Sequence, residues 1–217
     1  MIDASPFLVY GFAALTLLVA AAVTFVLRSA RAAVLILLWL AITGAVAARG
    51  MLGFDTMPPT MFVLAFVSSG IAIAAGLKLK TDAPLAALVA LQSFRLPLEL
   101  LMHRAYSEGV MPVQMSYSGL NFDIVTGATA IVVAFFAHRR GVVLAWNIMG
   151  TLLVTNIVTV AMLSTPIPLR VFHNEPANVW IARAPFVWLP AFLVPVALAG
   201  HLLIFRRLRR RQGDGAA

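Results

Sequence analysis

The chain contains no cysteine and little charge, since only 11% of its 217 residues are Asp, Glu, Lys or Arg. The absence of cysteine excludes disulfides, thiol nucleophiles, Cys-ligated zinc, iron–sulfur clusters and c-type haem, and it leaves the redox compartment undetermined. So few charges cannot solvate a soluble globule in which 62% of the residues are hydrophobic. The composition therefore predicts an all-α, polytopic integral membrane protein.

Long apolar runs predict the membrane spans, because a helix needs about 20 apolar residues to cross the hydrocarbon layer. Five runs contain no charge in their interior. Two others do: the fourth contains Arg95 and Glu99, and the fifth begins near Asp123. We expect one transmembrane domain over 1–217. Its seven helices are predicted at about 6–27, 32–48, 60–77, 83–103, 121–137, 141–164 and 184–205, followed by a basic tail over 206–217.

Local signals support several helix starts. Ser5 precedes Pro6, a typical N-cap followed by proline in the first turn, and Asn121 or Ser118 can cap the fifth helix. Ile2 and Asp3 precede the first apolar run and arginines follow it. Because a signal peptide has the reverse order, this run is expected to remain as the first helix.

Basic residues are divided unevenly between the predicted loops. If all seven segments cross, eleven of the sixteen Lys and Arg residues lie on one side, four lie on the other, and Arg95 lies inside the membrane. The excess marks the cytoplasmic side, so the N-terminus is expected outside and the C-terminus inside. The run Arg206–Arg211 would then contact anionic lipid. A six-helix alternative with a re-entrant fourth segment would place that run opposite Arg28 and Arg31.

Polar residues within the predicted spans are candidates for function, because charge inside hydrocarbon is costly. Gln92, Arg95, Glu99 and His103 lie on one face of the fourth helix by their spacing of i, i+3, i+7 and i+11. Further polar groups of the fifth and sixth helices lie at matching depths. We therefore predict an outward-open pocket between helices four, five and six, closed near Asn147. The candidate ligand-binding residues are Arg95, Glu99, His103, Asn121, Asp123, Asn147, Thr151 and Asn156.

Each candidate also has a structural interpretation, which the sequence leaves open. Arg95 and Glu99 are four residues apart and could neutralise each other as a buried pair. Asp123 could be a helix-start acid favoured by the dipole, and His103 could be an interfacial residue. The amides and hydroxyls of the sixth helix, such as Asn147, could be interhelical hydrogen-bonding groups.

Several activities have weak or no support in the sequence. Glu99, His103 and Asp123 could ligate a metal, but no HExxH pattern occurs and Arg95 would oppose a cation, so no metal site is predicted. A retinal Schiff base needs a lysine in the bundle, and the two lysines lie in a predicted loop. His103 and His201 are expected at opposite faces, which excludes haem ligation by both. Nucleic-acid binding is not expected, and the cofactor is unknown.

Two segments carry a resemblance to a known group of proteins. Gln114–Ile124, with the sequence QMSYSGLNFDI, and Pro185–Pro190, with the sequence PFVWLP and continuing to His201, resemble small multi-pass bacterial membrane proteins of unassigned function. The resemblance covers helices four to seven. It implies a location in the bacterial inner membrane, and it transfers no catalytic residue.

The leading functional hypothesis is a transporter or permease for a small molecule or ion. Arg95 would bind an anionic group or act as a counter-ion, and Glu99 would carry a proton or pair with Arg95. The ligand would be oriented by Asn121, Asp123 and Asn156. One alternative is an intramembrane enzyme, with or without a metal, that uses Glu99, His103 and Asp123. Another is a non-catalytic sensor or assembly subunit that binds partners through its two long outer loops, at 104–120 and 165–183. Homo-oligomerisation is left open.

Overall fold

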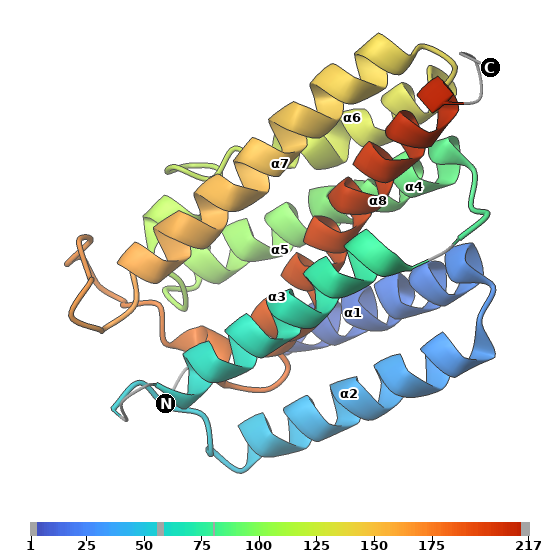
Figure 1. Ribbon diagram of the computed structural model, residues 1–217. Coiled ribbons are helices and arrows are strands. Elements are labelled where there is room, and N and C mark those ends of the chain that lie inside the picture. Colours follow the sequence, from blue (N-terminus) through green and yellow to red (C-terminus); the bar gives the residue numbers. More distant parts are fainter. Residues whose placement is uncertain (1–3, 56–58, 80, 214–217) are drawn as a thin grey trace.

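The chain folds into a bundle of long helices. The computed structural model describes residues 4–55, 59–79 and 81–213, with side chains described up to residue 209, and these ranges contain helices and no strand. The main helices are α1 (Pro6–Leu27), α2 (Ala30–Ala48), α3 (Thr60–Lys78), α4 (Leu85–Leu91), α5 (Arg95–Ser107), α6 (Ile124–Phe135), α7 (Arg140–Leu163) and α8 (Val194–Gly213). Short helical turns are η1 (Gln92–Phe94), η2 (Val113–Met115), η3 (Trp180–Ala182) and the π-helical η4 (Leu189–Leu193). Helix α8 packs against α3, α4 and α7, and α2 lies at the edge beside α1 (Figure 1).

Six helices in the described ranges are long and apolar enough to cross a membrane, with α4, η1 and α5 forming one continuous span, Leu85–Ser107. The seventh expected span, α6, has 12 residues. At 1.5 Å per residue it is about 18 Å long, which is shorter than the hydrocarbon layer of about 30 Å. The prediction of an all-helical protein of membrane type is confirmed, with six long helices and one short apolar helix.

The first two helices show how the sequence sets their ends. Helix α1 has the predicted bounds, and the Ser5 hydroxyl accepts a hydrogen bond from the Leu8 N–H at 3.2 Å. Helix α2 begins two residues earlier than expected, because Ser29 caps it through the Ala32 N–H, also at 3.2 Å. Between them Arg28 adopts a left-handed conformation with φ 50°. This single residue turns the chain from one helix into the next.

Helix α6 starts later than predicted, and neither Asn121 nor Ser118 caps it. The side-chain Oδ1 of Asn121 accepts a hydrogen bond from the Asp123 N–H at 3.1 Å, ahead of the helix. The Ser118 hydroxyl lies 3.3 Å from Nδ1 of His103. Both side chains are therefore used in the loop, and the helix begins at Ile124.

The last helix differs from the expectation of 184–205 at both ends. Residues 184–187 form turns, and the helical segment begins at Leu189. Pro190 follows directly, and a proline without an N–H is tolerated in the first turn of a helix. Helix α8 then continues past Phe205 to Gly213, so the arginines expected in a tail lie on the helix. The side chains of Arg210 and Arg211, and residues 214–217, lie outside the described residues.

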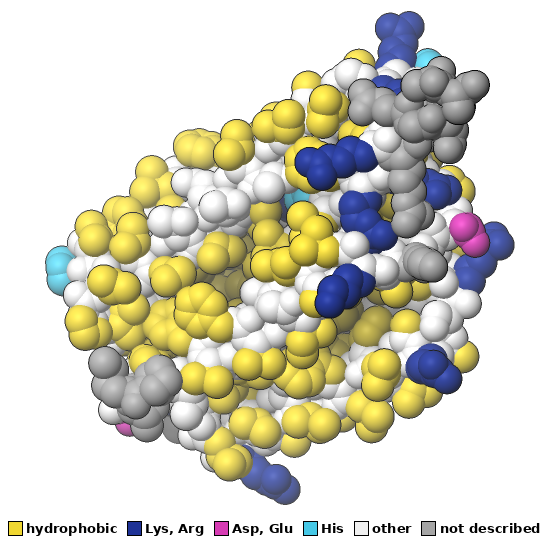
Figure 2. Space-filling view, in the orientation of Figure 1, with side chains coloured by type: hydrophobic (Ala, Val, Ile, Leu, Met, Phe, Trp, Pro, Cys, Tyr) yellow, Lys and Arg dark blue, Asp and Glu magenta, His cyan; other side chains and the backbone are white. Residues whose placement is uncertain are grey.

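The continuation of α8 has a visible cause in its contacts with α3. Nη1 of Arg206 donates hydrogen bonds to the carbonyls of Gly76 at 2.8 Å and Leu79 at 3.0 Å. These carbonyls lie at the C-terminal end of α3, where backbone acceptors lack partners within the helix and a cation is favoured. Figure 2 shows Lys and Arg side chains gathered at the end of the bundle where α8 ends.

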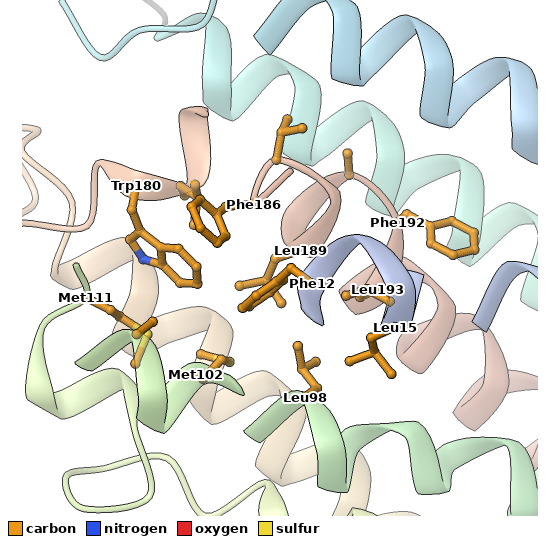
Figure 3. Packing of buried hydrophobic residues seen from close by; sticks show 14 of the residues in the cluster. Phe12, Leu15, Leu98, Met102, Met111, Trp180, Phe186, Leu189, Phe192 and Leu193 are labelled. Atoms are coloured by element: carbon orange, nitrogen blue, oxygen red, sulfur yellow. The ribbon is translucent and has the colours of Figure 1, made fainter. Parts of the chain in front are cut away.

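The hydrophobic core is centred on aromatic residues that join distant segments. Phe12 of α1 contacts Trp180 and Phe186 edge-to-face, with ring centroids 5.6 and 5.2 Å apart (Figure 3). Trp180 and Phe186 lie 5.0 Å from each other. Since Phe12 and Trp180 are fully buried, α1 holds the loop between α7 and η4 against the bundle.

A polar contact fixes the N-terminal end of α1. The Ser5 N–H and hydroxyl donate to the Glu108 carboxylate at 2.8 and 2.6 Å, and Nε of Arg104 donates to it at 2.5 Å. Burial acts to raise the pKa of Glu108, but these hydrogen bonds and the charge of Arg104 outweigh it and lower the pKa. Glu108 therefore stays ionised and ties the start of α1 to the end of α5.

Phe12→Ala should lower the thermal stability of the purified protein, because it removes a fully buried ring from the core. We expect a loss of about 3 kcal/mol in unfolding free energy. Phe25→Ala is the matched control, since Phe25 is on the same helix and 82% exposed. Equal thermal unfolding midpoints for the two variants in detergent would show that the aromatic core does not stabilise the bundle.

Candidate functional site

A buried ion pair joins α5 to the start of α6. Nε of Arg95 donates to Oδ2 of Asp123 at 2.6 Å, and Nη2 donates to Oδ1 of the same carboxylate. Nη2 also donates to the Gly150 carbonyl at 3.3 Å. Arg95 is 1% exposed and Asp123 is 4% exposed. A two-pronged contact of this kind neutralises both charges, which is the condition for burying either one.

The same arginine extends the network to α8 and α7. Nη1 of Arg95 lies 2.7 Å from Nε2 of His201, and Nδ1 of His201 lies 2.7 Å from Oδ1 of Asn147. Arginine can only donate, so Nε2 accepts and the imidazole is neutral with its proton on Nδ1. Nδ2 of Asn147 donates to the His201 carbonyl at 3.1 Å, which fixes the orientation of the amide. Four helices are thereby joined by one ordered chain of hydrogen bonds.

Two glycines make this close approach possible. A Cβ atom at Gly127 of α6 would collide with the backbone of Leu96, and one at Gly150 of α7 would lie 2.6 Å from Cε1 of His201. Small residues allow helices in a membrane to approach closely. Gly127 brings α6 against α5, so that Asp123 reaches Arg95, and Gly150 leaves room for the imidazole.

Glu99 is held separately from the ion pair. Its Oε2 accepts a hydrogen bond from Nδ2 of Asn121 at 2.6 Å, and Nδ2 also donates to the Met115 carbonyl at 3.0 Å. Glu99 is 1% exposed. Among the described side chains, no Lys, Arg or His forms an ion pair with it. The carboxyl group is therefore buried without a basic partner.

The charged residues line one cavity. Its volume is about 140 Å³, and it lies between α3, α5, α7 and the segment from η4 into α8. Arg95, Glu99 and Asp123 contribute charged groups, whereas the walls are mostly apolar. Along α7 the lining extends from Val154 to Met162, a distance of about 12 Å, and beyond the end of the helix it includes Thr165. The cavity is thus an elongated, mostly apolar space with ionisable groups toward one end.

The other end of the cavity contains an unused polar atom. Asn178 is fully buried and lines the cavity, and its Nδ2 donates to the Ala161 carbonyl at 3.0 Å and to the Thr165 hydroxyl at 3.1 Å. Its Oδ1 has no hydrogen-bond partner within the described part of the chain. A buried acceptor without a donor is costly, so Oδ1 of Asn178 is an unsatisfied polar atom at this end of the cavity.

The structure places the eight sequence-predicted residues in three groups. Arg95, Glu99 and Asp123 line the cavity, and Asn121 and Asn147 support its charged groups from behind. His103, Thr151 and Asn156 lie elsewhere. His103 stacks on Tyr117 with ring centroids 4.2 Å apart, Thr151 donates to the Asn147 carbonyl at 2.7 Å, and Asn156 donates to the Leu120 carbonyl at 2.7 Å.

Three sequence-based interpretations need correction. Arg95 and Glu99 are not a mutually neutralising pair, because Arg95 binds Asp123. The cavity is bounded by α3 and α8 as well as by the expected helices. His201 belongs to the network, although it was expected near the cytoplasmic end. The last helical segment begins at Leu189 instead of residue 184, so His201 is 12 residues from its start and not 17. This difference of five residues moves His201 by about 8 Å toward the middle of the bundle.

The three residues considered for a metal do not come together. No group of three His, Asp or Glu residues that could hold a metal ion is found among the described positions. His103 contacts Tyr117 and Ser118 instead, and it does not line the cavity of Glu99 and Asp123.

One family model matches the chain over residues 56–209, from the segment before α3 through most of α8, and it covers every residue of the network. The chain belongs to the DUF8737 family. The family is described as a domain of unknown function, so the resemblance to proteins of unassigned function is confirmed. The match extends one helix further toward the N-terminus than the sequence indicated. No curated protein and no solved structure matches the chain significantly.

Asp123→Asn should destabilise this DUF8737 protein more than Glu99→Gln does. Removing the Asp123 carboxylate leaves the buried Arg95 guanidinium without a counter-charge, at a cost of about 3 kcal/mol of unfolding free energy. Glu99 forms no ion pair, so Glu99→Gln leaves no buried cation unpaired. Adding Arg95→Gln to Asp123→Asn should restore part of the loss. Thermal unfolding of the three variants in detergent tests this order, and equal midpoints for the two single variants would contradict it.

Proposed function

We propose that the chain is a membrane permease for a small amphipathic ligand, with a proton carried by Glu99. The observation that carries the proposal is the setting of Glu99: a buried carboxyl group, lining an apolar cavity, with no basic partner among the described residues. Ionisable groups buried in a membrane bundle are typical of substrate pathways and proton relays.

The charge balance of the cavity depends on Glu99. Arg95 and Asp123 neutralise each other, so the remaining charge is that of the Glu99 carboxyl group. An unpaired carboxylate buried in apolar surroundings costs several kcal/mol. Glu99 therefore binds a proton when the cavity is empty, and it can exchange that proton for a ligand with a cationic group. This exchange would couple ligand movement to a proton gradient.

The apolar walls of the cavity favour a ligand whose main part is apolar. Phe66 of α3, Leu98 of α5 and Ile157 of α7 are among the side chains that face it. A ligand cationic group near Glu99 would place its apolar body along α7. A hydrogen-bond donor at its far end would reach Oδ1 of Asn178, the unpartnered acceptor. Pockets with apolar walls and a few fixed polar groups are typical of small-molecule sites.

The contacts of the outer loops support a role as a lid over the cavity more than a role as a surface that binds partners. Nε2 of Gln114 donates to the Ser164 hydroxyl at 2.8 Å, and Nδ2 of Asn174 donates to Oε1 of Gln114 at 2.8 Å. Together with Asn178, these contacts hold both loops against the end of the cavity. The sensor or assembly subunit, which needs these loops as a contact surface, has less support. The metal-dependent enzyme has less support as well, because His103 lies outside the cavity.

We further propose that the N-terminus lies outside and the C-terminus in the cytoplasm of a bacterial inner membrane. The uneven distribution of basic residues supports the orientation, and the sequence resemblance supports the location. In this orientation the cavity occupies the outer half of the bundle, with Arg95 and Glu99 at its deep end.

Proteoliposomes with an imposed pH gradient provide the transport test. Benzyltrimethylammonium is a suitable radiolabelled probe, because it is a permanent cation with an apolar ring. We expect gradient-driven uptake that falls more than tenfold in Glu99→Gln, since the amide cannot exchange a proton. Glu175→Gln, at an exposed position, should transport like the wild type. Undiminished uptake by Glu99→Gln would contradict the proposal.

The absence of native cysteine makes the orientation testable with single-cysteine variants. Leu169→Cys places a thiol in the loop after α7, where Leu169 is 63% exposed, and Arg209→Cys places one on the last part of α8. A membrane-impermeant maleimide should label the first variant in intact cells and the second only after permeabilisation. The reverse pattern would show the opposite orientation.

A further inference from the structure

A second, larger cavity lies on the opposite side of α3 from the ligand cavity. Its volume is about 480 Å³, and it is an apolar groove between α1, α2, α3 and α8. Its lining includes Leu35 and Trp39 of α2, Ala72 of α3 and Leu203 of α8. None of the residues of the ion-pair network faces it. Recessed apolar surface is visible on both sides of α3 in Figure 2.

The groove has the length of one membrane leaflet. Along α3 its lining extends from Ser68 to Leu79, about 16 Å, which is half of the hydrocarbon thickness of about 30 Å. Trp39 lines the groove at the end away from Leu79, and its indole N–H donates to the Ala191 carbonyl at 2.9 Å. The other end reaches the basic end of the bundle.

Two arginines stand at that open end. A small cleft that includes Arg206 and Arg207 adjoins the groove and shares three leucines with it: Leu79, Leu88 and Leu203. Arg206 is occupied by carbonyls of α3. Nη2 of Arg207 donates to the Asp82 carbonyl at 3.4 Å, but its Nε is buried and has no partner in the described chain. A buried guanidinium N–H without an acceptor calls for an anion.

We propose that this groove binds one acyl chain of an anionic phospholipid, whose phosphate accepts a hydrogen bond from Nε of Arg207. The charge around the opening fits this occupant, because Arg31 and Lys78 are exposed and adjoin the lining residues Ala32 and Leu79. The apolar lining fits the acyl chain. The anionic lipids of the cytoplasmic leaflet attract basic residues near the membrane surface. This step rests on the proposed orientation, which places this end of the bundle on the cytoplasmic side.

A second copy of the chain fits the groove less well. A helix of another copy could cover the apolar surface, but it would leave Nε of Arg207 without an acceptor. A phospholipid supplies the acyl chain and the phosphate in one molecule, in the geometry of a single leaflet. The site lies apart from Glu99 and does not depend on a transport function.

Tryptophan quenching by brominated acyl chains tests the site in the full-length protein. In phosphatidylcholine vesicles, a small fraction of brominated phosphatidylglycerol should quench Trp39 at about one-fifth of the concentration that brominated phosphatidylcholine requires, because a basic residue contributes about 1 kcal/mol. Trp39→Phe identifies the signal of Trp39. Arg207→Gln should remove the preference for the anionic lipid, and Arg209→Gln, the matched control at an exposed arginine of α8, should keep it.

Filling the groove provides a second, independent variant. Ala75 lines the groove, whereas Ala74 on the same helix is exposed and does not line it. Ala75→Phe should abolish quenching of Trp39 by both lipids, and Ala74→Phe should leave it unchanged. Three results would overturn the proposal: no preference for phosphatidylglycerol in the wild type, equal losses in Arg207→Gln and Arg209→Gln, or quenching that falls as the protein-to-lipid ratio rises. The last would show that a second copy covers the groove.

Discussion

The ion pair between Arg95 and Asp123 is the constraint to which the rest of the bundle conforms. A guanidinium in this apolar interior must have its carboxylate at contact distance, so α5 and α6 must approach closely. Gly127 permits that approach, and Gly150 leaves room for His201 on the remaining side of the guanidinium. The neutral tautomer of the histidine follows, since arginine offers only donors. One charged pair thereby fixes the mutual positions of α5, α6, α7 and α8.

Because that pair is self-neutralising, it gives Glu99 a different role from the one that its spacing suggests. At i and i+4 on one helix, Arg95 and Glu99 would make an ordinary ion pair. The competition from Asp123 removes this partner, and the amide of Asn121 holds Glu99 without neutralising it. A carboxyl group that is ordered, buried and unpaired can take a proton or a cationic ligand in turn. In the proposed function, the Arg95–Asp123 pair stays fixed, and because that pair is self-neutralising it leaves the charge of Glu99 free to change.

The sequence predicted the positions of the helices well, but it predicted poorly which helix faces contact each other, and the difference has a physical reason. Span length and hydropathy are local properties, so α1, α3 and α7 lie within one residue of their expected bounds. The depth of Arg95, Glu99 and Asp123 follows from counting along a helix, and it placed these groups at a common level. Which faces meet depends on small residues and on helix starts. A shift of five residues at the start of the last helix was enough to hide His201 from the predicted site.

Helix α3 forms a wall of both cavities, in its first half on one side and in its second half on the other. Its packing against α8 depends on Gly76, where a Cβ atom would lie 2.8 Å from Cβ of Leu202, and on the carbonyls that bind Arg206. An acyl chain in the groove would fill the space into which the C-terminal half of α3 could move. In the proposed function, release of a ligand displaces a wall of the ligand cavity, and α3, which has few buried residues, packs chiefly against α8 and η4. The bound lipid would then limit how far α3 can tilt, so that the composition of the surrounding leaflet would affect ligand exchange through one shared helix.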